Sequence, residues 1–176
     1  MKRKSKKNLK RLAFFAGFSV VILVVLASFY LGRRSAEQEQ PSITLTDGKV
    51  AVKLYYYNKL KDKLRTFDPK FVLPVERRIP RGKAPIQDTI KLLLQGKLRW
   101  QEKSAGFDTE FPNPEFKLLT VKLKDGVLTL KFTDVPGFTS GGASRVGLLA
   151  AQIKKTALQF PQVKEVRIIP EYLFQP

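Results

Sequence analysis

Residues 119–132 have the sequence LTVKLKDGVLTLKF, two alternating segments joined by Asp125 and Gly126. Side chains alternate between the two faces of a strand, and an Asp-Gly pair favours a two-residue hairpin turn. The register imposed by this turn puts six apolar side chains on one face, as the pairs Leu123 with Leu128, Val121 with Leu130 and Leu119 with Phe132. The sequence therefore predicts an amphipathic β-hairpin with one buried face.

The opposite face of the predicted hairpin is basic, because it carries Lys122, Lys124 and Lys131. Three ammonium groups on one face attract an anionic polymer or a lipid headgroup, and such binding weakens as salt is added. A solvated basic surface with no ligand is the alternative interpretation. These three lysines are the candidate anionic-ligand face.

Other elements are predicted on both sides of the hairpin. They are strands over 50–57, 71–79 and 163–169, and helices over 85–95 and 144–159. Pro74 restricts the second strand to a sheet edge, because proline has no N–H to donate. The stretch 97–114 has no periodicity, and we expect a loop held by its aromatic side chains. The order β-β-α-β-β-α-β predicts an α+β domain with a small mixed sheet and two helices.

Residues 12–31 are 20 consecutive uncharged and mostly apolar residues. As a helix they would span about 30 Å, the thickness of the hydrocarbon core of a bilayer. The sequence therefore predicts a single transmembrane helix over 12–32. The side chains expected to anchor it are apolar, namely Leu12, Phe14, Phe15, Phe18, Val21, Leu23, Leu26 and Leu31.

The flanks of this segment predict its orientation. Seven basic residues precede it, namely Lys2, Arg3, Lys4, Lys6, Lys7, Lys10 and Arg11, whereas two, Arg33 and Arg34, follow it. The more basic flank stays in the cytoplasm. We therefore expect a single-pass protein of the cell membrane, with a cytoplasmic tail over 1–11, a flexible stalk over 33–47 and an extracytoplasmic domain over 48–174. A cleaved signal peptide is the alternative, but its apolar run would be shorter.

Composition excludes many kinds of active site. The 176 residues include no His and no Cys, so no Ser-His-Asp triad, thiol nucleophile, disulfide or zinc site of His and Cys can form. The net charge is +18; nine of the 33 basic residues lie within residues 1–34 and none of the 15 acidic residues does. The length suits one folded domain.

Two polar clusters are candidate ligand sites. Residues 139–144, TSGGAS, form a Gly-rich loop before a helix, but their spacing matches neither phosphate-binding motif, and Ser144 suffices as a helix N-cap. Asp108 and Glu110, with Glu102 and Glu115 nearby, lack the pattern of a calcium loop. We therefore expect no metal site and no cofactor.

Nucleic-acid binding and serine catalysis are also disfavoured. The run Tyr55, Tyr56 and Tyr57 could stack bases, but alternation sends Tyr56 to the face opposite the other two, and the RNA-recognition signature is missing. The serines of the folded part, Ser104, Ser140 and Ser144, lie in no recognised catalytic motif. We expect no catalytic residues and no enzyme activity, and nucleic acid is an unlikely partner.

Five segments carry a resemblance to a known family. They are VKLYYYN at 52–58, LPVERRIP at 73–80, LLLQG at 92–96, VKLKDGVLTLKFTD at 121–134 and QIKKTALQFPQVKEVRIIP at 152–170. With them the chain resembles the GerMN, or sporulation and spore germination, domain. The closing segment matches the family at Thr156, Phe160, Pro161, Val163, Val166 and Ile168. The chain departs from the family where Lys97 follows Gly96, since the family often has proline there.

The resemblance implies a small domain like the ring-building motifs of secretion and sporulation assemblies, held outside the cytoplasm by an anchor. It implies no catalytic residues. We therefore expect a structural or interaction module of the cell envelope that contacts other envelope proteins or copies of itself. The alternative is a module that binds an anionic wall polymer or lipid headgroup through the basic face. Nothing in the residues themselves bears on sporulation.

Overall fold

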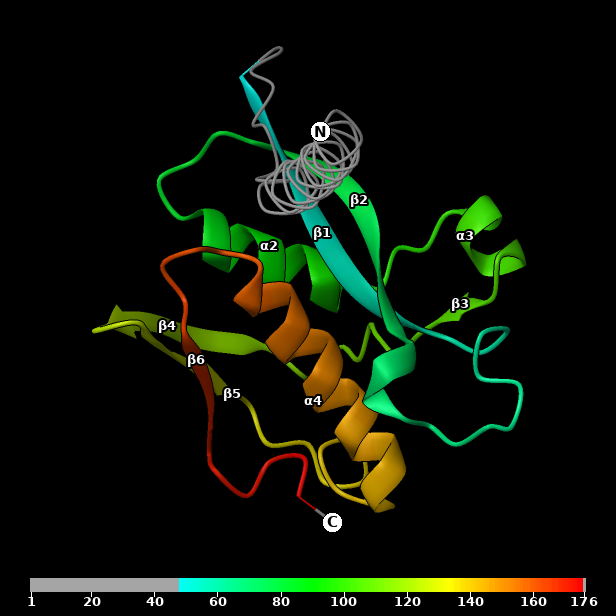
Figure 1. Cartoon of the computed structure of the whole chain (residues 1–176). Helices are drawn as coiled ribbons and strands as arrows, with labels where there is room; N and C mark the ends of the chain where they lie inside the picture. Colours follow the sequence, from blue (N-terminus) through cyan, green and yellow to red (C-terminus); the bar gives the residue numbers. More distant parts are fainter. Residues whose placement is uncertain (1–47, 176) are drawn as a thin grey trace, which may run out of the picture. The chain divides into compact units, whose positions relative to one another are not determined.

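The strands form two three-stranded sheets with two long helices between them (Figure 1). The structure is a computed structural model that describes residues 48–175. Its strands are β1 (Lys49–Asn58), β2 (Val72–Pro80), β3 (Phe107–Asp108), β4 (Leu118–Lys124), β5 (Val127–Phe132) and β6 (Glu165–Ile169). Its helices are the 3-10 turn η1 (Pro69–Phe71), α2 (Pro85–Leu94), α3 (Trp100–Ser104) and α4 (Ala143–Leu158).

The first sheet has the order β2-β1-β3 and is antiparallel. Pro74 lies on the edge strand β2 opposite Tyr55, which confirms the prediction that proline restricts this strand to an edge. β3 pairs with β1 only at Tyr57 and Asn58. Most of one edge of β1 therefore has no strand beside it.

The second sheet has the order β4-β5-β6, with β4 antiparallel and β6 parallel to β5. Because α4 connects β5 to β6, the two parallel strands are joined by a helical crossover. The prediction of an α+β fold is confirmed, whereas the prediction of one mixed sheet is wrong. The physical reason is that α4 lies against the free edge of β1, where a strand of the second sheet would otherwise pair.

The hairpin of β4 and β5 follows the predicted turn. Asp125 and Gly126 have φ of 50° and 82°, as a type I′ turn requires, and Val121 lies opposite Leu130. The predicted position of Leu119 is wrong, because the register shifts between Leu118 and Thr120. Leu118 takes the place opposite Phe132, and Leu119 is 51% exposed.

The two long helices confirm the predicted ones, with small changes at their ends. Gly96 has φ of 59° just after α2, where its lack of a side chain permits the left-handed turn. α4 begins one residue earlier than predicted and its N-cap is Gly142, so the predicted capping role of Ser144 is wrong. The loop predicted over 97–114 contains the short helix α3 and the strand β3.

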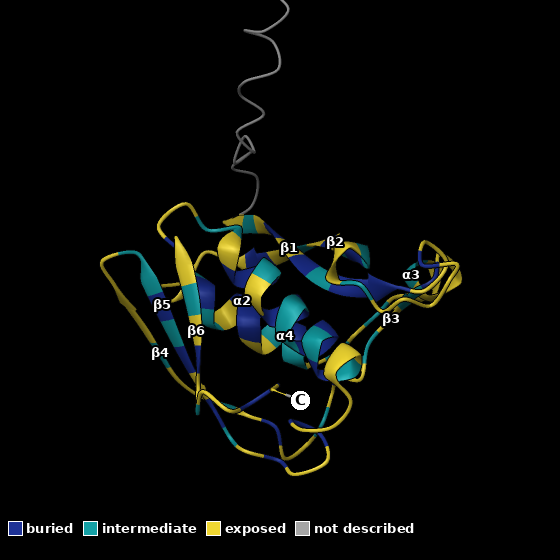
Figure 2. Cartoon of the chain, turned by 60° about the horizontal axis from the view of Figure 1, so that its bottom comes forward, coloured by how far each residue is buried: buried dark blue, intermediate teal, exposed yellow. Residues whose placement is uncertain are grey.

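The main core lies where α2 and α4 pack between the sheets, seen as the dark-blue segments of Figure 2. Leu54 and Tyr56 of β1 point into this core, together with Leu128 and Leu130 of β5. The opposite face of β1 is covered as well, because Tyr57 packs in a second cluster with residues of β2 and α4. The C-terminal half of β1 is therefore covered on both faces, whereas Ala51 and Lys53 in its first half are exposed.

The predicted cytoplasmic tail (1–11), transmembrane helix (12–32) and stalk (33–47) lie outside the described residues. Within residues 48–175, no helix has both the length and the apolar character needed to cross a membrane.

Candidate functional site

The predicted basic face lies on the second sheet. Lys122 and Lys124 of β4 share one face with Lys131 of β5, because Lys122 lies opposite Thr129 and Lys131 lies opposite Thr120. All three lysine side chains are exposed. The structure thus brings together the three lysines predicted to form this face.

β6 adds charges to this face that the sequence did not reveal. Arg167 lies beside Thr129 and Glu165 beside Val127, and the Nε of Arg167 is 2.6 Å from the Oε1 of Glu165. This ion pair is internally neutral and exposed, so it adds little stability. The register of a parallel strand 35 residues or more away in sequence is not encoded in any local pattern, so Arg167 could not be assigned to the face beforehand.

The Gly-rich loop before α4 is held by its own helix. The hydroxyl of Thr139 donates to the Oδ1 of Asp134 over 2.7 Å, and the Nη1 of Arg145 lies 3.2 Å from the carbonyl oxygens of Phe138 and Ser140. The loop therefore presents carbonyl oxygens to a cation at this point. That arrangement explains the loop without a bound phosphate.

Three of the four acidic residues considered as a metal or carboxylate site, Asp108, Glu110 and Glu102, have separate cationic partners. Glu110 pairs with Arg145, while the Oδ2 of Asp108 is 3.4 Å from the Nζ of Lys59. Glu102 lies on α3 and pairs with Arg77 of β2. Over the described range 48–175, no three side chains of the metal-binding types come together.

The pair of Arg77 and Glu102 is the most enclosed ion pair of the domain. Two guanidinium nitrogens of Arg77 donate to the two carboxylate oxygens of Glu102 over 2.6 and 2.7 Å. The backbone N–H of Arg99 donates to the same carboxylate over 2.7 Å. Burial alone would raise the pKa of Glu102, but these hydrogen bonds and the charge of Arg77 hold it below its ordinary value. The pair fixes α3 to β2.

The three tyrosines of β1 do not form a surface for stacking bases. The hydroxyl of Tyr56 donates to the carbonyl oxygen of Leu93, and burial raises the pKa of Tyr56 to about 12. The hydroxyl of Tyr57 donates to Asp62 over 2.8 Å, and burial together with Asp62 raises the pKa of Tyr57 to about 12. Tyr56 faces away from Tyr57, as alternation predicts.

Asp62 organises the loop between β1 and η1, a role that sequence patterns did not reveal. Its buried carboxylate accepts hydrogen bonds from the Tyr57 hydroxyl, from the N–H and hydroxyl of Thr66, and from the N–H of Phe67. Burial would raise the pKa of Asp62, but these four hydrogen bonds lower it below its ordinary value. A lone aspartate among lysines gives no local signal of this role.

A pocket of about 180 Å³ lies between the first sheet and α4. Tyr57 and Phe67 stack along one side with ring centroids 5.9 Å apart. On the α4 side, the Oε1 of Gln152 accepts a hydrogen bond from the hydroxyl of Thr109 over 2.9 Å. Glu110 and Arg145 of the lining also pair with each other, so these polar groups of the pocket already have partners.

Comparison with known proteins identifies the fold described above. The family model described as Germane, sporulation and spore germination, matches residues 53–171. The chain therefore belongs to the Germane family. The search of curated proteins gives no match.

Two solved structures are similar to this Germane domain. The first GerMN domain of the sporulation protein GerM from Bacillus subtilis is 16% identical, with a TM-score of 0.49, and the match covers 68% of this chain and 80% of that one. The tandem GerMN domains of the same protein are 23% identical, with a TM-score of 0.46, and the match covers 76% of this chain and 43% of that one.

The closing segment of the Germane domain explains why the two sheets stay separate. The backbone N–H of Tyr55 donates to the Oγ1 of Thr156 over 3.0 Å. The side-chain amide of Gln159 makes two bonds to the backbone of Lys53, accepting its N–H and donating to its carbonyl oxygen, each over 2.7 Å. Side chains of α4 thus satisfy an edge of β1 that would otherwise need a strand.

Proposed function

We propose that residues 12–31 anchor this Germane domain in the cell membrane and that the domain acts outside the cytoplasm as a non-catalytic interaction module. The 20 uncharged residues and the basic flank before them support the anchor and its orientation. The partner is another envelope protein or a second copy of the chain.

The observation that carries this proposal is the exposed edge of the second sheet. β4 is an edge strand in the described sheet, and its Leu119 and Leu123 are 51% and 41% exposed. Unpaired strand edges bind extended segments through the backbone, while apolar side chains add burial on association. β4 offers both, so it is the surface best suited to another protein.

Sedimentation velocity of residues 36–176 over a range of concentrations tests self-association. Reversible oligomers are expected, and Leu119→Asp should shift them towards monomer because it places a charge on the contact. Leu158→Asp is the matched control, since Leu158 is 47% exposed at the end of α4. If the fragment is a monomer at all concentrations, the partner is a different envelope protein. If Leu119→Asp captures such a partner as well as the wild type does, the proposed role of β4 is wrong.

The anchor has its own test. The full chain should remain with membranes after alkaline extraction, and a tag at its C-terminus should be accessible to protease from outside the cell. Release of a shortened chain into the medium would show that residues 1–31 are a cleaved signal peptide.

The basic face supports a second function, the binding of an anionic envelope polymer or headgroup. Lys122, Lys124 and Lys131 share one exposed face, and their charges are not neutralised by the nearby pair of Arg167 and Glu165. Binding of the domain to a polymer of phosphodiesters should fall steeply with salt and should weaken in Lys122→Gln with Lys124→Gln. Lys154→Gln, at an exposed lysine of α4, is the control. Salt-independent binding would exclude this function.

A further inference from the structure

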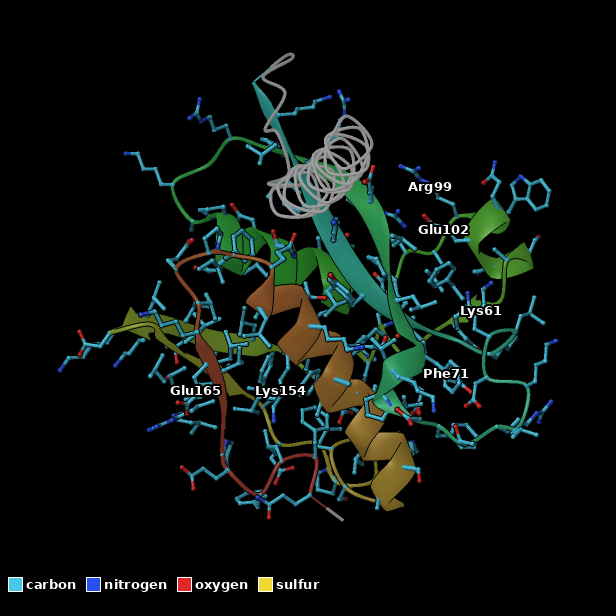
Figure 3. All side chains as sticks on the ribbon, viewed as in Figure 1. Lys61, Phe71, Arg99, Glu102, Lys154 and Glu165 are labelled. Carbon is cyan, nitrogen blue, oxygen red and sulfur yellow. The ribbon has the colours of Figure 1, made fainter. Side chains whose placement is uncertain are left out.

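One end of the domain combines exposed apolar side chains with exposed cations. It is formed by residues 59–67, the loop after β1, and by residues 99–103 around α3; we call it the tip. Figures 1 and 2 show both segments at the same end of the molecule, away from β4, β5 and β6. In Figure 3, Lys61 and Arg99 lie at this end and Glu165 lies at the other.

The apolar side chains of the tip are unusually exposed. Leu64 is 87% exposed, Trp100 72% and Leu60 58%, while the leucines and isoleucines of α2 and β5 are mostly buried. Exposed apolar side chains of this size gain no stability from the fold itself. Three of them lie in the two segments of the tip, and exposed apolar side chains of this kind suit association.

The exposed charge of the tip is entirely positive. Its exposed charged side chains are Lys59, Lys61, Lys63, Arg65, Arg99 and Lys103. The two carboxylates of the tip do not offset this charge. Asp62 is buried and accepts hydrogen bonds from its own loop, and Glu102 is paired with Arg77. The neighbouring Asp108 of β3 offsets only Lys59, at 3.4 Å. The tip therefore complements an anionic surface.

The loop of the tip is held in one conformation. Arg65 and Phe67 have φ of 51° and 53°, left-handed values that disfavour residues other than glycine, and Asp62 binds the N–H of Phe67 to maintain them. Leu60 packs so closely on Gly106 that a Cβ there would lie 2.5 Å from the Cγ of Leu60. The exposed side chains are thus presented by a rigid backbone, which lowers the entropy lost on binding.

We propose that the tip docks on the surface of a membrane that contains anionic lipids, with Leu64, Leu60 and Trp100 entering the headgroup region and the lysines and arginines contacting phosphates. Apolar burial and attraction to anionic lipid act together in interfacial binding, and tryptophan favours this region. Leu64 projects from a loop rather than lining a flat patch, and a deformable lipid surface accommodates such a side chain without a matching pocket.

The reach of the chain permits docking on the same membrane that holds the proposed anchor, and this part of the inference rests on that anchor. β1 has ten residues, so the tip lies about 33 Å along the strand from its start. A chain of 15 residues, the length of the predicted stalk 33–47, can span at most about 50 Å. A domain tethered in this way can therefore bring its tip to the surface of the bilayer. The tether gives the tip a high effective concentration near the lipid.

Trp100 is the only tryptophan of the chain and reports directly on the tip. The full chain is reconstituted into vesicles of phosphatidylcholine alone or with phosphatidylglycerol, with and without brominated acyl chains. In anionic vesicles we expect a blue shift of the emission and quenching by bromine, both reduced by added salt. Flotation of the same sample tests separately whether the chain is anchored. A chain that does not float is mixed with preformed vesicles, and the emission of Trp100 and its quenching are measured there.

Variants separate the tip from the rest of the domain. Lys61→Gln with Lys63→Gln should weaken docking about 30-fold, since each basic residue near an anionic surface contributes about a fivefold factor. The matched control is Lys91→Gln with Lys154→Gln, which removes the same charge from exposed positions of α2 and α4. Leu64→Asp should abolish the quenching, whereas Leu158→Asp should not.

Three results would overturn the proposal. The first is Trp100 emission that bromine does not quench in anionic vesicles; the second is equal quenching in zwitterionic vesicles. The third is a blue shift that grows with protein concentration in detergent without lipid, which would make a second copy of the chain the occupant of the tip.

Discussion

The two sheets of this domain differ in how completely the fold covers their central strands. The C-terminal half of β1 is covered on both faces, and the strand pairs with β2 along one edge and meets β3, Thr156 and Gln159 along the other. β5 has one face over the core, whereas its other face is open and carries Lys131. The first sheet is thus enclosed on both sides along half of its central strand, and the second is enclosed on one side only.

This difference separates positions that maintain the fold from positions free to bind. Substitutions from Leu54 to Tyr57 of β1 should cost stability on either face, whereas those on β5 should alternate between severe and mild. Surfaces available for partners are then the open face and edge of the second sheet, and the tip beyond the end of β1. The five predictions below test this separation.

The largest effect is expected from Leu130→Asp on the covered face of β5. Leu130 is fully buried, and an unpaired charge there should destabilise the domain by more than about 4 kcal/mol, enough to unfold it. Circular dichroism with urea denaturation measures this loss. Thr129→Asp, one residue away on the open face, should cost about 1 kcal/mol or less. Equal tolerance of both changes would mean that the hairpin register is wrong.

Glu102→Gln should have the second largest effect, because it breaks the enclosed pair that fixes α3 to β2. Loss of charge-assisted hydrogen bonds from Arg77 should cost about 2–3 kcal/mol. Urea denaturation at pH 7 measures the change. Glu165→Gln, in the exposed pair with Arg167, should cost about 0.5 kcal/mol or less, and a larger loss there than at Glu102 would reverse the order of the two pairs.

The contribution of Glu102 should also depend on pH. Its pKa is lowered in the folded domain relative to its ordinary value of 4.5, so its stabilisation is present above that value. It is lost as the pH falls through the lower folded value, because protonation removes the charge that Arg77 binds. The difference between wild type and Glu102→Gln should therefore shrink below about pH 4. A difference that stays constant down to pH 2 would contradict the shift.

Thr156→Val tests the covered edge of β1. The change preserves shape but removes the acceptor of the Tyr55 N–H, which should cost about 1–2 kcal/mol. Hydrogen exchange should accelerate at the Tyr55 amide more than at its neighbours in β1. Thr129→Val on the open face of β5 is the control, with an expected change of about 0.5 kcal/mol or less. Unchanged exchange at Tyr55 would show that the edge is satisfied in another way.

The features that the sequence predicted depend on nearby residues, whereas the features that it did not predict depend on residues far apart in the chain. The hairpin turn at Asp125 and Gly126, the edge position of Pro74 and the positions of both long helices depend on neighbours in sequence, and all were predicted. The separation of the sheets depends on Thr156 and Gln159 meeting β1 about 100 residues away. Alternation is a local signal and contains no information about which edge a helix will cover.

The candidate surfaces divide in the same way. The three lysines of the basic face follow from the period of two in one hairpin, so the sequence sufficed to place them. Arg167 joins them through a parallel pairing, and the tip unites the loop after β1 with α3, so both needed the structure. The role of Asp62 was not predicted, because its carboxylate bonds to backbone groups of its own loop. Any polar residue in a basic stretch could do so, and the sequence gives no signal that distinguishes the one that does.

The smallest effect on stability is expected from Lys122→Glu on the open face. Lys122 is exposed and has no ion-pair partner in the described domain, so the free energy of unfolding should change by about 0.5 kcal/mol or less. Binding to an anionic polymer should nevertheless fall, because a negative charge now lies between Lys124 and Lys131. Urea denaturation and a binding titration on the same sample measure both quantities. A folded variant that binds as tightly as the wild type would remove the basic face from consideration and leave the edge of β4 and the tip as the surfaces through which this domain meets its surroundings.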